Sequence, residues 1–251
     1  MSVMALILTA IFLPLFPLSM VFNLLYTRAR NPLLRSVMLL AWPLIGLAMI
    51  KAFSVNIPHW LSTWAVLTSL LYALRALALR EMGLWTGFMA TSSWALLWVL
   101  GGEGSGAMPF TLFALGISVP LALMAALTGE LEKRYGAAYL GLYGGLAQTI
   151  PRFAGILVMA VLAVIATPLF PAFFAMLSII IKATPVAPYM AMGVGLVWML
   201  WSWAGAKLLQ GLIVGPKQAA VVDLSAANMG LYIAILAALL LGGVYGLGAT
   251  L

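Results

Sequence analysis

The 251 residues are 65% hydrophobic and 7% charged, and they carry a net charge of +7. Soluble domains contain roughly 25% charged residues, so this composition excludes a soluble globular domain and indicates a polytopic membrane protein. The basic residues are scattered in small groups between hydrophobic stretches, which is typical of topology signals and not of a nucleic-acid-binding surface. The chain has no Cys and one His, which excludes disulfides, iron–sulfur clusters, zinc–thiolate sites and c-type haem.

The hydrophobic stretches predict an all-α bundle of membrane helices in a single transmembrane domain, residues 1–251. A span needs roughly 20 apolar residues, and by this measure we expect about nine segments. The stretches lack the alternation that a membrane β-barrel requires. The first is too long for the core of a signal peptide and is interpreted as a retained helix. The segments fall near residues 3–26, 36–56, 60–79, 83–101, 108–128, 152–168, 170–183, 187–213 and 226–248.

Basic residues mark one set of connections between these segments. The connections that hold His59 and Glu103 have no Lys or Arg. This alternation predicts that the basic connections lie on the inner face of the membrane and the other two on the outer face. The basic groups are Arg28, Arg30 and Arg35; Arg75 and Arg80; and Lys133, Arg134 and Arg152.

Prolines interrupt the hydrophobic sequence between residues 168 and 188. The short segments there are either two separate spans or one broken helix. A helix that breaks at membrane depth leaves backbone groups that need protein or water partners, and such breaks tend to line polar paths. The prolines are Pro168, Pro171, Pro185 and Pro188.

Few ionisable residues fall inside the apolar segments, and Lys51 is the clearest of them. It lies about 10 Å of helix rise before the connection that holds His59, which fits either a snorkelling side chain or a member of a buried polar path. Lys182 closes a segment and fits an anchor, with an ion-path role as the alternative. Lys207 follows Trp198, Trp201 and Trp203, a group that indicates an interfacial belt.

The sequence predicts no enzyme active site and no cofactor or metal site. The glycines at 101–104 lack the Lys-Ser/Thr pair of a phosphate-binding loop. No buried carboxylate pair, nucleophile–base pair or metal-ligand cluster stands out, and Glu103 and Asp223 are expected in water. Any redox chemistry would belong to partner subunits.

The stretch from Gly129 to Pro171 resembles a known family. It is similar to the proton-conducting antiporter-like subunits of respiratory complex I, which Mrp antiporters and membrane-bound hydrogenases share. The likeness covers nearly the whole chain and is most specific at 129–152. The matching residues are Gly129, Leu131–Glu132, Arg134, Gly136, Gly144–Ala147 and Pro151–Arg152; of these, Gly144, Gly145, Pro151 and Arg152, together with Pro168, are expected to have structural roles.

The resemblance also implies two departures from the family. Full members have two inverted repeats and the match begins within the first, so we expect a truncated antiporter-like fold. Three ionisable positions of the family's ion path fall on Gly83, Leu121 and Met176, and only Lys51 is retained. Lys182, about 9 Å along a helix from Met176, is a candidate displaced charge. Because protons need a chain of ionisable groups or water to cross hydrocarbon, we expect no conduction by the family's complete route.

These features predict an accessory or partial-path membrane subunit of a multi-subunit proton- or cation-translocating complex. The expected location is the bacterial inner membrane, and the expected partners are lipid and other membrane subunits, with a full-length antiporter-like paralogue among the candidates. A cation-driven inorganic-carbon (bicarbonate or CO₂) uptake complex is one alternative. A stand-alone small transporter, or an assembly factor without transport, is another.

Overall fold

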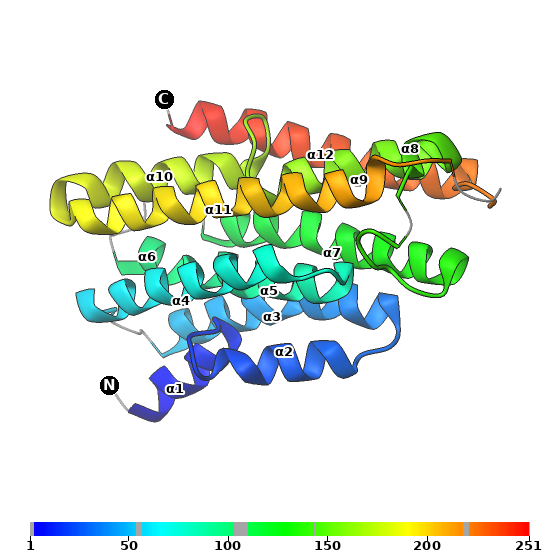
Figure 1. The fold of residues 1–251 in the computed structure, drawn as a ribbon. Coiled ribbons are helices and arrows are strands. Elements are labelled where there is room, and N and C mark those ends of the chain that lie inside the picture. Colours follow the sequence, from blue (N-terminus) through cyan, green and yellow to red (C-terminus); the bar gives the residue numbers. More distant parts are fainter. Residues whose placement is uncertain (1–2, 54–56, 103–109, 143, 218–220, 251) are drawn as a thin grey trace.

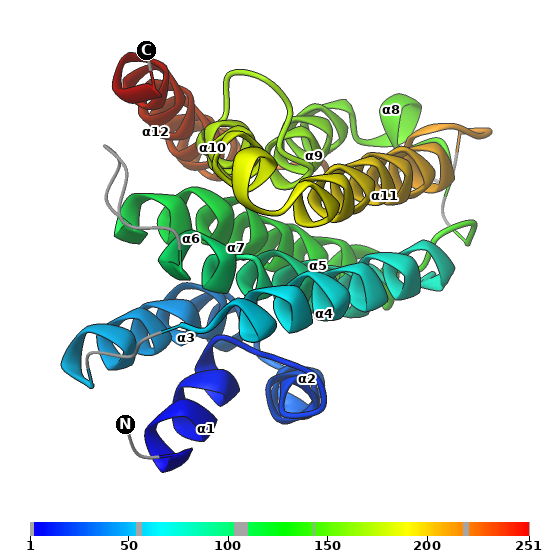
Figure 2. The same ribbon diagram turned by 90° about the vertical axis from the view of Figure 1, so that its left-hand side faces the viewer.

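The computed structural model describes residues 3–53, 57–102, 110–142, 144–217 and 221–250. Across these residues the chain is helical, and its β structure is limited to an isolated bridge between Glu81 and Tyr139. The helices are α1 (Val3–Phe12), α2 (Ser19–Arg28), α3 (Pro32–Ala52), α4 (His59–Ala78), α5 (Met82–Ala95), α6 (Leu97–Gly102), α7 (Phe110–Tyr135), α8 (Leu146–Thr149), α9 (Pro151–Val164), α10 (Pro171–Val186), α11 (Pro188–Ile213) and α12 (Ala226–Thr250). The bundle has α1–α3 at one side and α9–α12 at the other (Figure 1 and Figure 2).

Five of the described helices are long and apolar enough to cross a membrane, and the chain is a multi-pass membrane protein. They are α3, α4, α7, α11 and α12. By contrast, α9 and α10 have 14 and 16 residues, whereas a span needs roughly 20. The all-α membrane bundle expected from the sequence is therefore confirmed, but the count of nine segments is not.

The first predicted segment, residues 3–26, is two helices and not one. The stretch 13–18 separates α1 from α2 and contains Pro14 and Pro17. A proline has no backbone N–H to donate to the carbonyl four residues earlier in a helix, and its ring clashes with the preceding turn. The expectation of a single continuous span here was wrong, because this proline pair ends α1 at Phe12.

A second interruption separates α9 from α10. The two helices follow one another along the bundle (Figure 1), and both contact α7, α11 and α12. The structure therefore adopts the broken-helix alternative. The interruption spans residues 165–170, at the start of the predicted interval 168–188. The remaining prolines belong to helices: Pro171 begins α10, Pro185 lies in its last turn and Pro188 begins α11.

The centre of the bundle is α7. It contacts α3, α5, α9, α10 and α12. Of the residues in its hydrophobic stretch, 78% are buried inside the bundle, against 22% for the corresponding stretches of α3 and of α12. The helix also runs to Tyr135, beyond the predicted end at residue 128, so the charged residues 130–134 lie on its last turns and not in a connection. The outer faces of α3 and α12 are left for lipid or partner subunits.

The three basic groups named above gather at one end of the bundle, which we call the basic end. Arg35 at the start of α3 pairs with Glu132 near the end of α7, and the amide nitrogen of Leu140 donates to the carbonyl of Arg80. Arg134 Nε donates to the carbonyl of Val222 at 2.9 Å. The three basic connections thus share one end, while their assignment to the inner face stays a prediction. Glu103 lies outside the described residues, so its expected position in water stays a prediction.

Candidate functional site

The interruption between α1 and α2 is bonded by side chains from neighbouring helices. Thr68 of α4 accepts a hydrogen bond from the amide nitrogen of Phe16 at 3.2 Å. Backbone groups freed by a helix break need such partners because lipid offers none. Three indole N–H groups also donate to carbonyls here: Trp42 to Ile11 at 3.0 Å, Trp64 to Phe16 at 2.8 Å and Trp98 to Leu13 at 2.9 Å.

The interruption between α9 and α10 is bonded in the same way. Trp198 Nε1 of α11 donates to the carbonyls of Ile165 and Ala166, each at 3.2 Å. Thr167 Oγ1 donates to the carbonyl of Leu162 at 2.9 Å. Ala166 has φ 57°, which is uncommon for a residue with a side chain. Both interruptions are therefore held by neutral donors in defined geometry.

Uncharged groups supply the polar side chains of the core. Among the residues whose side chains the structure describes, a set that leaves out Lys182, no Asp, Glu, Lys, Arg or His is buried. The buried polar residues are all hydroxyl-bearing: Thr9, Ser19, Ser62, Thr68, Ser69, Thr86, Thr91, Ser92, Ser93, Ser118 and Thr128. The described part of the core can thus form hydrogen bonds, but it holds no charged side chain.

Hydroxyl and indole groups also join α4, α5 and α11. Trp201 Nε1 donates to Ser92 Oγ at 2.8 Å, and Ser92 Oγ donates to the carbonyl of Ser69 at 2.8 Å. Trp201 is 1% exposed. Of the three tryptophans expected in an interfacial belt, Trp198 and Trp201 therefore act as buried or half-buried donors, whereas Trp203 is exposed.

A charged cluster lies at the basic end, centred on Arg35. Arg35 Nη1 is 3.3 Å from Glu132 Oε1, and these side chains are 12% and 31% exposed. Arg35 Nε donates to the carbonyl of Ala29 at 2.7 Å, and the guanidinium carbon is 5.7 Å from the ring centroid of Tyr26. Because Arg35 is largely withdrawn from solvent, this pair is screened less than the usual surface ion pair.

Glu81 caps the start of α5 beside this cluster. Its carboxylate oxygens accept hydrogen bonds from the backbone N–H groups of Gly83 and Leu84, at 3.1 and 3.2 Å. Burial raises the pKa of the Glu81 carboxyl, with a smaller contribution in the same direction from the charge of Glu132. The N–H of Leu84 and the charge of Arg35 act against this shift. The basic end therefore holds a carboxyl with raised proton affinity.

Polar side chains of α2 lead inward from the charged cluster. Ser19, Asn23 and Tyr26 follow one another at four and three residues and so share one helix face. Asn23 Nδ2 donates to Thr91 Oγ1 at 3.1 Å, and the hydroxyls of Ser19 and Tyr72 are 2.8 Å apart. From Tyr26 to Ser19 the helix rises about 10 Å. This polar column runs from the charged cluster to the interruption between α1 and α2.

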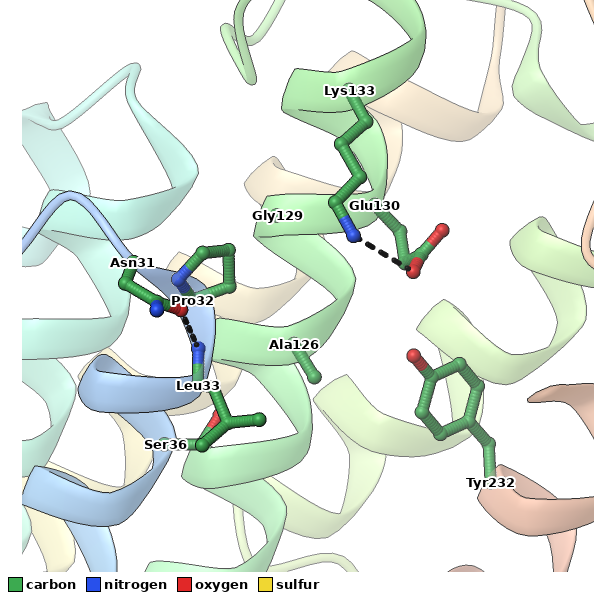
Figure 3. Close-up of a pocket in the computed structure, with 9 residues that line it drawn as sticks. All are labelled: Asn31, Pro32, Leu33, Ser36, Ala126, Gly129, Glu130, Lys133 and Tyr232. Atoms are coloured by element: carbon green, nitrogen blue, oxygen red, sulfur yellow. Dashed lines mark hydrogen bonds and ion pairs between the residues drawn. The ribbon is translucent and has the colours of Figure 1, made fainter.

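A cavity of about 280 Å³ opens at the basic end between α3, α7 and α12 (Figure 3). Glu130 and Lys133 of α7 line it, and Tyr232 of α12 faces them. Asn31 and Ser36 line its α3 side. Lys133 Nζ is 3.8 Å from Glu130 Oε1. Both signs of charge reach this cavity, so charge alone does not select an anion or a cation.

The predicted ion-path lysines lie on different helices. Lys51 lies in the last turn of α3, exposed, whereas Arg35 begins that helix at the basic end. Lys182 lies on α10, and its side chain is outside the described part of the chain. Lys207 Nζ donates to the carbonyl of Leu77 at 2.9 Å, which ties α11 to the end of α4. The ion-path roles of Lys51 and Lys182 stay predictions.

Two of the three positions where the resemblance implies lost charges lie in the apolar core. Leu121 of α7 and Met176 of α10 are each 1% exposed. Gly83 is at the start of α5, where a Cβ would lie 2.5 Å from Glu81 Oε1. A side chain at residue 83 would therefore have to displace the Glu81 cap.

The glycine motif fixes the approach to α9. Gly145 has φ 78°, and a Cβ there would lie 2.7 Å from the carbonyl oxygen of Gly215. Pro151 is the first residue of α9, where its missing N–H costs nothing. Asp223 accepts from the backbone N–H groups of Arg152 and Phe153, at 2.8 and 3.1 Å. Asp223, expected in water, is thus the cap of α9.

The described residues hold no group of three or more His, Cys, Asp or Glu placed to bind a metal ion. No family model matches the chain, and no curated protein matches it by sequence.

Solved structures do match the fold. A chain of respiratory complex I from Thermus thermophilus with bound NADH matches with a TM-score of 0.79 at 22% identity, over 94% of this chain and 53% of that chain. A chain of the Mrp complex from Dietzia sp. DQ12-45-1b matches with a TM-score of 0.78 at 18% identity, over 95% and 55%. A chain of the membrane-bound sulfane sulfur reductase, an archaeal respiratory membrane complex, matches with a TM-score of 0.74 at 17% identity, over 94% and 51%.

These neighbours are antiporter-like membrane subunits, so the resemblance inferred from Gly129–Pro171 is confirmed at the level of fold. The chain spans about half the length of each neighbour. The polar column of α2 and the indole donors were not predicted from the sequence. The signal for the column was the presence of Ser19, Asn23 and Tyr26 in a segment otherwise apolar enough for a membrane helix.

Proposed function

We propose that this chain is an accessory membrane subunit of a multi-subunit cation-translocating complex, in which other subunits supply the complete ion path. The observation that carries the proposal is the neutral core. An antiporter-like fold is kept, with both helix interruptions bonded, but no Asp, Glu, Lys, Arg or His among the side chains that the structure describes is buried. Crossing hydrocarbon requires such groups or water, so the chain does not carry ions across on its own.

The polar column of α2 supports a partial path at the basic end. The hydroxyl of Tyr26 and the indole nitrogen of Trp85 are buried and have no hydrogen-bond partner in the described part of the chain. Buried polar atoms are normally bonded to protein or water. Water that reaches the Glu81 carboxyl would satisfy them, and the column would extend this wet region to the interruption between α1 and α2.

Lys51 would take part in ion transfer only by pairing with a group from a partner subunit. Its exposed position on α3 leaves the ammonium to snorkel or to pair with a group from another membrane subunit. A full-length antiporter-like paralogue is one such partner. A stand-alone transporter is less well supported because residues 165–171 at the second interruption include no ionisable side chain.

Co-purification and ion flux test this proposal together. A tagged chain extracted in mild detergent should elute with other integral membrane subunits in fixed stoichiometry, and that complex should translocate protons or another cation in liposomes. Lys51→Ala should lower the flux of the complex if Lys51 belongs to the path, while Lys217→Ala serves as a charge-matched control. A homogeneous single chain that transports alone would contradict the proposal.

A further inference from the structure

A second, mainly apolar cavity of about 350 Å³ lies between α9 and α12. From α9 it is lined by residues that recur every three or four positions, such as Arg152, Gly155 and Met159, and from α12 by residues such as Ile233 and Leu240. This spacing places each set on one helix face. The cavity is therefore a groove that runs along both helices, starting at the basic end.

The length of the groove corresponds to one leaflet of a bilayer. From Arg152 to Met159 the α9 side rises about 10 Å, and from Met229 to Leu240 the α12 side rises about 16 Å. The hydrocarbon core is about 30 Å thick, so one leaflet takes about half of that. A groove of this depth, open on the outer side of the bundle, fits a single acyl chain.

Arg152 places a positive charge at the mouth of the groove. The described ion pairs involve Arg35, Lys133 and Arg134, and among the described residues no carboxylate oxygen lies within 4.0 Å of the Arg152 guanidinium nitrogens. Its Nη1 makes a long contact of 3.4 Å with the carbonyl of Leu224. Asp223 binds the backbone N–H of Arg152 and not the guanidinium. The side chain is thus available to a phosphate, which Arg binds in bidentate geometry.

We propose that this groove binds one anionic phospholipid from the leaflet at the basic end. The phosphate pairs with the guanidinium of Arg152, and one acyl chain lies between α9 and α12. The head and tail chemistries meet in one site: a guanidinium that forms no ion pair with the described carboxylates, beside an apolar groove as long as one leaflet is thick. The site is independent of the proposed role in ion translocation.

The test is thermal unfolding of the purified full chain in detergent, titrated with phosphatidylglycerol, phosphatidylcholine or inorganic phosphate. Ligands that bind the folded state raise the unfolding temperature. Phosphatidylglycerol should raise it with saturation, and neither other ligand should do so at matched concentration. Arg152→Gln should raise the phosphatidylglycerol concentration needed for half of the temperature shift roughly tenfold, as expected for loss of a charged hydrogen bond.

Matched variants separate the groove from general charge and folding effects. Gly155→Leu should abolish the response, because a Cβ at Gly155 meets nothing within 4 Å and the leucine would occupy the groove. Gly195→Leu on α11, also in open space, should leave it intact. Arg80→Gln removes an exposed cation at the same end and should have a smaller effect than Arg152→Gln.

Several results would overturn the lipid site. Equal responses to phosphatidylglycerol and phosphatidylcholine would remove the headgroup assignment, and an equal response to inorganic phosphate would indicate a free-anion site. A full response in both Arg152→Gln and Gly155→Leu would exclude the groove. If no lipid shifts the unfolding temperature but Gly155→Leu prevents co-purification with partner subunits, then a partner helix and not a lipid occupies it.

Discussion

The indole nitrogen of Trp198 on α11 lies 3.2 Å from the carbonyl oxygen of Ile165 at the end of α9. It also reaches the carbonyl of Ala166, so one neutral side chain serves two backbone acceptors that the helix break releases. Three indoles serve the other break in the same manner. The protein thus keeps two interrupted helices while filling nearby core positions such as Leu121 and Met176 with apolar side chains.

Trp198→Phe should destabilise the protein by about 1–3 kcal/mol, because two acceptors in a buried segment lose their donor. The measurement is thermal or denaturant unfolding in detergent. Trp203→Phe on the same helix is the control: Trp203 is 61% exposed, and its loss should change stability by no more than about 0.5 kcal/mol. Equal effects of the two substitutions would show that the bond to the break does not matter.

Arg35→Gln should destabilise the protein by about 1.5–3 kcal/mol, since Glu132 and the carbonyl of Ala29 would lose a charged donor. A double-mutant cycle with Glu132→Gln should give a coupling of about 1 kcal/mol. Lys133→Gln provides the comparison, because Lys133 is 70% exposed and 3.8 Å from Glu130, and it should cost little. Additive effects of Arg35→Gln and Glu132→Gln would mean that the pair contributes nothing.

The raised pKa of Glu81 makes stability depend on pH. Because burial raises this pKa above its ordinary value of 4.5, the folded chain binds the proton more tightly than the unfolded chain. The stability that Glu81 contributes is therefore full below 4.5 and is lost as the pH rises through the folded-state pKa. The unfolding temperature of the wild type minus that of Glu81→Gln should fall over this range. A difference that is constant or grows with pH contradicts the shift.

Gly145→Ala should destabilise by about 1–3 kcal/mol, because residue 145 has a positive φ and lies against the backbone of Gly215. Gly155→Ala on the exposed side of α9 is the matched substitution. It should be neutral or stabilise by up to about 1 kcal/mol, since alanine favours a helix interior. If both variants lose equal stability, the close approach at Gly145 is not the cause.

The sequence predicted the parts of the structure that depend on composition and on helix-breaking prolines and glycines. Hydropathy predicted the membrane bundle, the basic groups lie at one end as expected, and Pro168 lies in a real interruption. The run Gly129–Pro171 indicated the fold that the solved structures share. These features depend on residues close together in the chain, so sequence reasoning can reach them.

The remainder depends on contacts between distant residues. Pro14 and Pro17 can be read in the sequence, but residues 3–26 are apolar enough for one continuous membrane helix. The break between α1 and α2 depends on tryptophans from other helices that donate hydrogen bonds to it, and hydropathy does not reveal them. Trp198 and Trp201 were assigned to an interfacial belt and not to the core. Their hydrogen-bond partners, Ile165 and Ser92, are 33 and 109 residues away in the sequence, so the local pattern does not show these bonds. The polar column of α2 is likewise completed by Tyr72 and Thr91 from other helices.

Proton flux into liposomes that contain the purified chain alone tests the central claim most directly. A pH-sensitive dye inside the vesicles would report acidification under an imposed gradient, with empty liposomes as the baseline. The neutral core predicts no flux above that baseline, in wild type and in Lys51→Ala alike. Saturable flux through the wild-type chain alone would contradict the account, because it would require a complete path in a chain whose described core holds no buried charge.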